Sequence, residues 1–527
     1  MTVTRPAGPL DPDALDMAAI RAGALRDRPV TVLGLARSGI ALARFLADVG
    51  ARVTIYDGRP ATELGDAIEA LEGRSVTLAL GPTVDPAATW AAAHHVATSP
   101  SITPDYPTTE PRLRSALQAL RSARSNGDAT APALVSEADL FLRLCPAPTI
   151  GVTGTKGKTT TASLAASILS ADPAHPVVLG GNIGIPLIER LPELTAGHRV
   201  VIELSELQLP TLSRGTTVAV YTNVSSDHLD RHGSLEAYRR VKRRLAELVD
   251  PGGATVLNAD DPVVAGYASL GVARTVLYRR GQPGEGELGV VDGWIEASGI
   301  ERLAAAGGDG RADPVETGPG VRIMPAGNLA IPGAHNVSNA LAAIAVGLLF
   351  GVRPEAIRTA AASFTGVEHR LEPVDLVDGV RFVNDSQGTQ PDAVIAALRA
   401  FDGPIVLIAG GRDKGIDLGA LAPVVAERAI AAVLIGESGP TLAASFRAAG
   451  LARIELAADL DDAVKRADAI ARDVLREGAA STKAATVLLS PAAASFDMFT
   501  DYAARGRAFK AAVAALAETR RSQGGTR

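Results

Sequence analysis

Cysteine is almost absent from this chain, since Cys145 is the single one among 527 residues. One thiol excludes a disulfide framework and any zinc cluster built on cysteines. We interpret Cys145, which lies just before an apolar segment, as a small buried hydrophobic residue.

Long apolar runs and a surplus of basic residues are also missing. The most apolar segment, residues 340–352, is shorter than the ~20 residues that a membrane-spanning helix needs, and residues 1–28 lack the apolar core of a secretory signal. Lys+Arg number 52 and Asp+Glu 58, a net charge of −6, whereas proteins that neutralise phosphates need a basic surplus. We therefore expect a cytoplasmic protein without a membrane or nucleic-acid partner.

Apolar residues are plentiful at 47%, which is enough for several hydrophobic cores. The length alone suggests three or four domains. Short β-branched runs that end in glycine-bearing turns occur at residues 29–39, 148–159, 404–414 and 485–495, and helical patterns separate them. This alternation predicts an α/β fold with parallel sheets covered by helices. Ligands of such sheets bind beyond the carboxyl ends of the strands, where these turns fall.

The most informative motif is GVTGTKGKTTT at residues 151–161, between an apolar strand and a helical run. Its glycines let backbone N–H groups approach a phosphate chain at a helix N-terminus. Lys158 is placed to reach the β- and γ-phosphates, and the Thr159 hydroxyl to bind Mg²⁺. The alternative is an ordinary tight turn between strand and helix. The glycines Gly151 and Gly154 depart from the usual GxxxxGK[ST] spacing, which disfavours a standard motor or GTPase.

Two further strand ends carry polar side chains that do not suit a core. Glu203 ends the run 200–203, and His228 follows the run 218–223. Both are expected at the phosphate end of the sheet, where a hard cation that bridges phosphates takes such ligands. A loop histidine without a role is the other interpretation of His228.

Residues 234–248 predict a helix with Ser234 as its N-cap. Lys242 shares the inward face with Tyr238 and Leu245, because these residues are three and four positions apart. A buried lysine needs a partner or a modification. The alternative is a lysine whose stem is buried while its charge reaches water.

These motifs together resemble one family, the Mur ligases. Besides the phosphate loop, the matching segments occur in order over nearly the whole chain: GGNIG from Gly180, ELSELQL from Glu203, SDHLD from Ser226, YRRVK from Tyr238, GAHNVSN from Gly333, HR at 369–370, NDS from Asn384, GGRDK from Gly410 and LLSPAAASFDMF from Leu488. Within the family they are most similar to members that add D-glutamate to UDP-N-acetylmuramoyl-L-alanine.

The resemblance implies three α/β domains: a Rossmann-like UDP-substrate domain at 1–147, a central P-loop ATPase-like parallel-sheet domain at 148–366, and a Rossmann-like glutamate-binding domain at 367–527. It implies a cytoplasmic monomer that uses ATP and two Mg²⁺ ions, which Mn²⁺ can replace. Lys242 then matches the family's carbamylated lysine, a carboxylate-like metal ligand.

The resemblance also assigns the site residues. The residues matched to catalysis are Lys158, His228, Lys242 and Lys414. Those matched to ATP are Gly154, Thr155, Lys156, Gly157, Lys158, Thr159, Thr160, Asn336, Asn339, Arg370 and Asp385. The UDP-substrate residues are Arg37, Ser38, Asp57, Arg59, Ser101, Asn182 and His228. The glutamate residues are Gln387, Thr389, Lys414, Ser495, Phe496 and Tyr502. The metal ligands are Thr159, Glu203, His228 and carbamylated Lys242.

Some positions depart from the family pattern. Gln387 stands where many relatives have lysine, and Ser101 replaces a usual glycine. Residues 122–132 are expected to form a small, polar linker or insertion, and residues 281–320, which have little periodicity, an elaborated surface region. The chain is also longer than typical relatives near residues 307–314.

The implied reaction is amide formation through an acyl phosphate. The alternatives are a ligase of the same family that adds another amino acid, such as L-glutamate or in the manner of a folylpolyglutamate synthase, an NAD-dependent dehydrogenase, and a non-catalytic nucleotide switch. The dehydrogenase fits poorly, because the turn GLARSG at residues 34–39 lacks the second glycine of GxGxxG.

Overall fold

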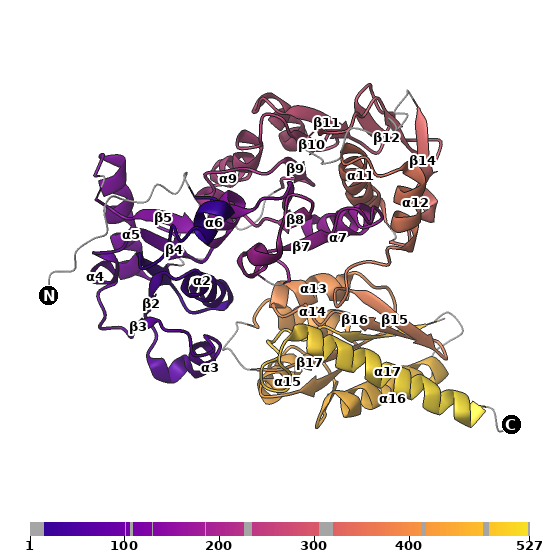
Figure 1. The fold of residues 1–527 in the computed structure, drawn as a ribbon. Coiled ribbons are helices and arrows are strands. Elements are labelled where there is room, and N and C mark those ends of the chain that lie inside the picture. Colours follow the sequence, from indigo (N-terminus) through magenta and orange to yellow (C-terminus); the bar gives the residue numbers. More distant parts are fainter. Residues whose placement is uncertain are drawn as a thin grey trace. The chain divides into compact units, whose positions relative to one another are not determined.

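The computed structural model describes residues 15–100, 102–105, 109–128, 130–184, 186–225, 234–304, 320–331, 333–412, 418–477 and 484–524. The chain divides into two compact units, Met1–Phe364 and Thr365–Arg527 (Figure 1). Within the described residues the first unit contains two sheets and the second contains one. The predicted α/β fold class is confirmed.

The N-terminal sheet is parallel throughout, in the order β3-β2-β1-β4-β5. Its strands are β1 (Pro29–Leu33), β2 (Arg52–Asp57), β3 (Thr77–Leu80), β4 (His95–Thr98) and β5 (Ala133–Ser136). Its helices are α1 (Met17–Arg21), α2 (Arg37–Asp48), α3 (Gly65–Glu69), α4 (Pro86–Trp90), α5 (Pro111–Ser125) and α6 (Glu137–Leu144). The strand order reverses at β1, which creates the crevice where Rossmann-like sheets bind ligands.

The central sheet has the order β14-β13-β12-β11-β10-β9-β6-β8-β7. Its parallel part contains β6 (Thr149–Thr153), β7 (Val177–Gly181), β8 (Arg199–Glu203), β9 (Val218–Tyr221), β10 (Ala254–Asn258), β11 (Arg274–Tyr278) and β12 (Glu287–Val291), and β13 (Trp294–Ser298) and β14 (Val321–Pro325) continue it antiparallel. Its helices are α7 (Lys158–Leu169), α9 (Leu235–Glu247), α10 (Pro262–Ala265), α11 (Ala334–Leu349) and α12 (Pro354–Ser363).

Helix α11 explains the most apolar segment of the sequence. It lies beside α7 against the central sheet (Figure 1), and every residue from Ala340 to Leu349 is buried. The segment is therefore apolar on all sides because protein surrounds it. Among the described residues, no helix combines the length and hydropathy needed to cross a bilayer.

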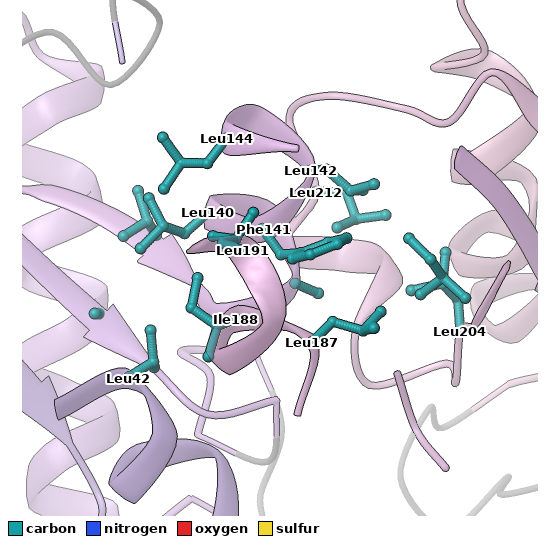
Figure 2. Packing of buried hydrophobic residues seen from close by; sticks show 14 of the residues in the cluster. Leu42, Leu140, Phe141, Leu142, Leu144, Leu187, Ile188, Leu191, Leu204 and Leu212 are labelled. Atoms are coloured by element: carbon teal, nitrogen blue, oxygen red, sulfur yellow. The ribbon is translucent and has the colours of Figure 1, made fainter. Parts of the chain in front are cut away.

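The two sheets of the first unit share one hydrophobic cluster. Figure 2 shows Phe141 of α6 meeting Leu187 and Leu191 of the 3-10 helix η3 (Leu187–Glu193), with Leu42 of α2 nearby. Glu137 of α6 is buried at this contact and accepts a hydrogen bond from the Ile188 amide at 3.4 Å. Burial raises the pKa of the Glu137 carboxyl to about 7.

In the second unit, helices cover both faces of a sheet with the order β15-β16-β20-β17-β18-β19. The strands are β15 (Glu372–Val377), β16 (Val380–Asn384), β17 (Ile405–Gly410), β18 (Ala431–Ile435), β19 (Arg453–Leu456) and β20 (Ala485–Leu489). One face carries α13 (Pro391–Arg399), α14 (Leu421–Arg428) and α15 (Gly439–Ala448), and the other carries α16 (Leu460–Glu477) and α17 (Tyr502–Gly524).

Two expectations about irregular segments are wrong in part, although the described residues of 126–132 do lie outside helices and strands. The expected linker at 122–132 begins inside α5, which continues to Ser125 because the helix already anchors Leu113, Leu117 and Leu120 and its small polar residues suit the exposed face. The expected elaboration at 281–320 contains the hairpin β12–β13. Its turn is Asp292-Gly293, both with positive φ, a hairpin signal that we overlooked. Residues 305–319, and with them the extra length near 307–314, lie outside the described part of the chain.

The interpretation of Cys145 holds only in part. The residue packs beside the shared cluster but is half-buried rather than fully buried. Burial raises the pKa of its thiol to about 11, so the thiol stays protonated and unreactive at neutral pH.

A buried ion pair at the start of β8 supports one prediction. Arg199 is 1% exposed; it pairs with Asp172 at 2.9 Å, donates to the Phe350 carbonyl and stacks on the Phe350 ring. Asp172→Ala leaves this guanidinium buried without a carboxylate, so we expect the free energy of unfolding of the first unit to fall by about 2 kcal/mol in urea denaturation. Glu193→Ala breaks an exposed pair with Arg190 and should cost about 0.5 kcal/mol or less. Equal losses would contradict this account.

A second prediction concerns His95 on β4. The ring is buried, and neither nitrogen has a hydrogen-bond partner among the described residues. Burial lowers the pKa of His95 from 6.5 to about 4. Protonation therefore favours the unfolded chain: the stability that His95 contributes is complete above pH 6.5 and is lost as the pH falls toward 4.

The measurement compares the pH dependence of the unfolding free energy of wild type with that of His95→Phe. Glu137 and Asp385 have raised pKa values and change stability with pH in the opposite direction, but both proteins contain them, so their contributions cancel in the difference. Between pH 8 and pH 5.5 we expect the wild type to lose about 1 kcal/mol more unfolding free energy than the variant. Parallel pH profiles for the two proteins would show that His95 is not a buried neutral ring.

Candidate active site

The predicted phosphate loop connects β6 to α7. Gly157 is the N-cap of α7 and has φ +87°, and Gly154 has φ +145°. A Cβ atom on Gly154 would lie 2.0 Å from the Thr222 hydroxyl, and one on Gly157 would lie 2.4 Å from the Asn339 amide oxygen. Only glycine fits these two positions. The loop thus leads its backbone into the N-terminus of a helix, which is a favourable place for an anion.

Asn223, just after β9, holds this loop from the neighbouring strand. Its backbone oxygen accepts from the Thr155 amide at 2.7 Å, and its side chain accepts from the Lys156 amide at 3.0 Å and donates to the Lys156 oxygen at 2.9 Å. Thr155 and Lys156 therefore use their amides within the protein and would need other atoms to contact a nucleotide. Asn223 is not among the residues predicted from the sequence, because its pairing depends on the adjacency of β6 and β9.

The start of α11 meets the same loop. Asn339 is buried and accepts from the Thr161 hydroxyl at 3.3 Å, and its amide nitrogen donates to the Asn336 side chain at 3.1 Å. The Lys158 ammonium folds back onto the Thr155 oxygen at 2.9 Å. The structure thus brings Lys158, Asn336 and Asn339, predicted from segments far apart in the sequence, to one place.

Glu203 ends β8, next to β6, and is 2% exposed. Its Oε1 accepts from the Asn182 side chain at 2.9 Å, whereas its buried Oε2 has no hydrogen-bond partner among the described residues. A buried carboxylate oxygen without a donor is costly unless a cation is bound there. The described part of the chain holds no group of three or more His, Cys, Asp or Glu side chains suited to a metal. The other predicted ligands are a hydroxyl (Thr159), a modified lysine (Lys242) and His228, which lies outside the described residues.

Lys242 is fully buried on α9, which confirms the predicted inward face and the Ser234 N-cap and makes the water-reaching alternative wrong. Its ammonium donates to the Gly154 oxygen at 3.0 Å and to the Thr153 hydroxyl at 3.4 Å, and it lies over the Tyr238 ring at 5.5 Å. The Tyr238 hydroxyl is 3.0 Å from that of Thr155. The side chain of Lys242 therefore ends at the underside of the phosphate loop.

In the N-terminal sheet, Asp57 ends β2 and ties two loops together. It accepts from the Leu35 amide at 2.8 Å and from the Arg59 side chain at 2.8 and 3.0 Å. Burial alone would raise the pKa of Asp57, but the bonds from Arg59 and the amides hold it below its usual value. Arg37 and Ser38 open α2 beside this turn, and Ser101 lies outside the described residues.

Two open cavities of about 580 and 590 Å³ lie at the other end of that sheet. Asp48, Gly50 and Arg74 line both of them, and neither contains a predicted site residue.

In the second unit, Asp385 follows β16 and is buried. It accepts from the Ser490 hydroxyl at 2.7 Å and from the Leu371 amide at 3.1 Å. Burial raises the pKa of Asp385 to about 6. Arg370 precedes Leu371, and the preceding His369 has φ +64°. This places Arg370 and Asp385, predicted for the nucleotide, on adjoining turns.

Of the residues predicted for glutamate, Gln387, Thr389, Ser495 and Phe496 lie on loops of the same unit, and Tyr502 begins α17. The Gln387 amide donates to the His369 oxygen, and the Thr389 amide to the Gln387 oxygen. The buried Arg505, which we had not considered, donates to the Ser386 hydroxyl and backbone and to the Ala493 oxygen. The Tyr502 oxygen accepts from the Ser386 hydroxyl at 2.7 Å, Ser495 is buried and Phe496 is 59% exposed. Lys414 lies outside the described residues.

The first unit combines a parallel sheet, a loop that requires Gly154 and Gly157 at a helix N-terminus, and the buried Glu203 carboxylate, whose Oε2 could bind a cation. These features are typical of an enzyme that uses a nucleotide. Two family models match the chain: "Mur ligase middle domain" over residues 152–347 and "Mur ligase, glutamate ligase domain" over residues 369–480. The chain belongs to the Mur ligase family and is an ATP-dependent ligase.

Three relatives carry the name UDP-N-acetylmuramoylalanine--D-glutamate ligase. The protein of Symbiobacterium thermophilum is 39% identical over 94% of this chain and all of its own length. That of Roseiflexus sp. is 38% identical over 91% of this chain and 96% of its own. That of Pelotomaculum thermopropionicum is 36% identical over 93% and 98%.

Proposed function

We propose that this chain joins the amino group of D-glutamate to the alanyl carboxylate of UDP-N-acetylmuramoyl-L-alanine, with conversion of ATP to ADP and phosphate, in peptidoglycan precursor synthesis. The observation that carries the chemistry is the phosphate loop with Glu203 and Lys242 buried against it. The three relatives, aligned over 91% or more of the chain, support the two substrates.

The phosphates of ATP would lie on the loop from Gly154 to Thr160. Lys158, which now donates to Thr155, is close enough to turn toward the β- and γ-phosphates and neutralise their charge. Asn339 borders the loop at Gly157 and bonds Asn336, and we propose both as nucleotide contacts. In the second unit, Arg370 and Asp385 are proposed as further nucleotide contacts.

Mg²⁺ ions fit the donor set beside the loop. Glu203 Oε2, the Thr159 hydroxyl, His228 and a carbamate on Lys242 would hold two of them, and hard oxygen ligands suit this cation. The carbamate forms when the neutral Lys242 amine adds CO₂ and loses a proton, which turns a buried cation into an anionic ligand. The metal would supply charge neutralisation on the transferring phosphoryl group.

The chemistry then has two steps. An oxygen of the alanyl carboxylate attacks the γ-phosphorus, the bond to ADP breaks, and an acyl phosphate forms. The glutamate amine adds to the acyl carbon, phosphate leaves with the electrons of the C–O bond, and the nitrogen loses a proton to give the amide. Lys158 stabilises charge on the phosphoryl oxygens in the first step.

The substrates divide between the domains that we propose at 1–147, 148–366 and 367–527. Arg37, Ser38, Asp57, Arg59 and Ser101 would bind the UDP portion, and Asn182 and His228 the muramoyl-alanyl portion. The set that would receive glutamate is Gln387, Thr389, Lys414, Ser495, Phe496 and Tyr502. We also propose that the enzyme acts in the cytoplasm as a monomer.

The test is ADP release by the purified protein with ATP, Mg²⁺ and UDP-N-acetylmuramoyl-L-alanine, with amino acids added one at a time. We expect turnover with D-glutamate only. Turnover with L-glutamate alone would keep the ligase chemistry and overturn the proposed amino acid, which Gln387 would then help explain. No turnover with any amino acid would overturn the UDP substrate.

A further inference from the structure

Tyr221, the last residue of β9, makes an unusual contact with α9. The side chain is fully buried. Its hydroxyl donates to the backbone oxygen of Lys242 at 2.7 Å and accepts from the backbone amide of Ala246 at 2.9 Å. Those two groups are four residues apart and are partners in the α-helical ladder. A phenol from a strand thus bonds both members of one rung, the rung that begins at Lys242.

The strand that carries this phenol is held on several sides. The Tyr278 hydroxyl donates to the Tyr221 oxygen at 2.9 Å, and the Tyr267 ring meets the Tyr221 ring edge-on at 5.1 Å. Tyr221 is also the direct register partner of Thr153 on β6. The bond from Tyr278 and the pairing with β6 fix the backbone of Tyr221 in the sheet, and the Tyr267 ring, from the 3-10 helix Gly266–Ser269, packs against the Tyr221 ring.

The other end of Lys242 meets the same place in the sheet. Its ammonium donates to the Thr153 hydroxyl and the Gly154 oxygen. The backbone oxygen of Lys242 is therefore bonded to Tyr221 on β9, and its side-chain nitrogen is bonded to Thr153 and Gly154 at the end of β6. One strand pair, β6–β9, fixes the lysine at both ends.

We propose that Tyr221 is a positioning residue for Lys242: its hydroxyl sets the distance and rotation of α9 so that the lysine nitrogen is presented to the phosphate loop. This inference rests on the proposed function, in which Lys242 carries the carbamate. Without the hydroxyl, the Lys242 oxygen and the Ala246 amide lose their bonds to Tyr221, and α9 loses this link to β9. A side-chain displacement of about 1 Å at a reacting centre costs up to about a hundredfold in rate.

The test compares Tyr221→Phe with Tyr267→Phe. The control removes a tyrosine hydroxyl that also bonds a carbonyl of α9, that of Arg239 at 3.2 Å, away from Lys242. The readouts are the ¹³C signal of the lysine carbamate with labelled bicarbonate, kcat and KM for ATP, and the midpoint of thermal unfolding.

For Tyr221→Phe we expect a carbamate signal that requires about tenfold more bicarbonate, kcat reduced about tenfold or more, and KM for ATP within twofold of wild type. For Tyr267→Phe we expect carbamate and kcat within twofold of wild type. A Tyr221→Phe protein that unfolds at lower temperature but keeps normal bicarbonate dependence and kcat would overturn the positioning role. So would equal loss in both variants.

If Tyr221→Phe does not fold, 4-aminophenylalanine at position 221 gives the same comparison. Its amine donates to the Lys242 oxygen but accepts poorly from the Ala246 amide, so an intermediate bicarbonate dependence is expected, and wild-type dependence would overturn the inference. Wild-type protein that forms no carbamate and has no ligase activity would instead contradict the proposed function.

Discussion

Replacement of Lys158 by alanine will lower kcat for ADP release by about a thousandfold. The ammonium is the one lysine nitrogen at the start of α7, 2.9 Å from the loop oxygen of Thr155. In the proposed reaction it neutralises charge that grows on the phosphoryl oxygens as the γ-phosphate moves, so its loss raises the barrier more than it weakens ground-state binding. Steady-state kinetics at saturating ATP and UDP substrate measure the effect.

The matched control is Lys465→Ala, an exposed lysine on α16 outside the site. Its kcat should stay within twofold of wild type. If Lys158→Ala retained more than about a tenth of the wild-type kcat, Lys158 would not be the residue that stabilises the transferring phosphate.

Lys242→Ala should likewise reduce activity by about a thousandfold, and a short carboxylic acid should restore part of it. The substitution opens a space beneath Gly154 where the ammonium now lies. If the working form of Lys242 is a carbamate, acetate or formate at millimolar concentration will supply the missing anionic oxygens. The measurement is kcat as a function of added carboxylate, at constant ionic strength.

Lys158→Ala serves as the control for rescue, since a carboxylate cannot replace a lost cation. We expect acetate to restore Lys242→Ala and to leave Lys158→Ala inactive. Rescue of Lys242→Ala by methylammonium instead of acetate would show that Lys242 works as a cation, and full activity without any addition would remove it from the site.

Patterns within short segments predicted most of the architecture. The alternation of β-branched runs and helical periods identified the strands β1, β6, β8, β9, β17 and β20, because a strand or helix is selected largely by which side chains face a core. The glycines of residues 151–157 marked the loop between β6 and α7, and in the structure Gly154 and Gly157 have positive φ, a requirement of the loop backbone itself. The inward face of Lys242 followed from helical spacing. The β12–β13 hairpin was missed because the turn signal Asp292-Gly293 was given too little weight.

The partners within the site depended on packing. Tyr221 reaches a helix rung 21 residues away, and Ser490 reaches Asp385 across 105 residues. The register that brings Thr153 beside Tyr221, and the loop that brings Asn223 to Lys156, arise from strand adjacency in the central sheet. The local sequence pattern of a strand does not show which strand lies next to it, because the pattern is the same beside any neighbour. Thus the residue types needed for phosphate and metal chemistry can be recognised in the sequence. The hydrogen bonds that orient these side chains form only when the strands pair and α7 and α9 pack against the central sheet.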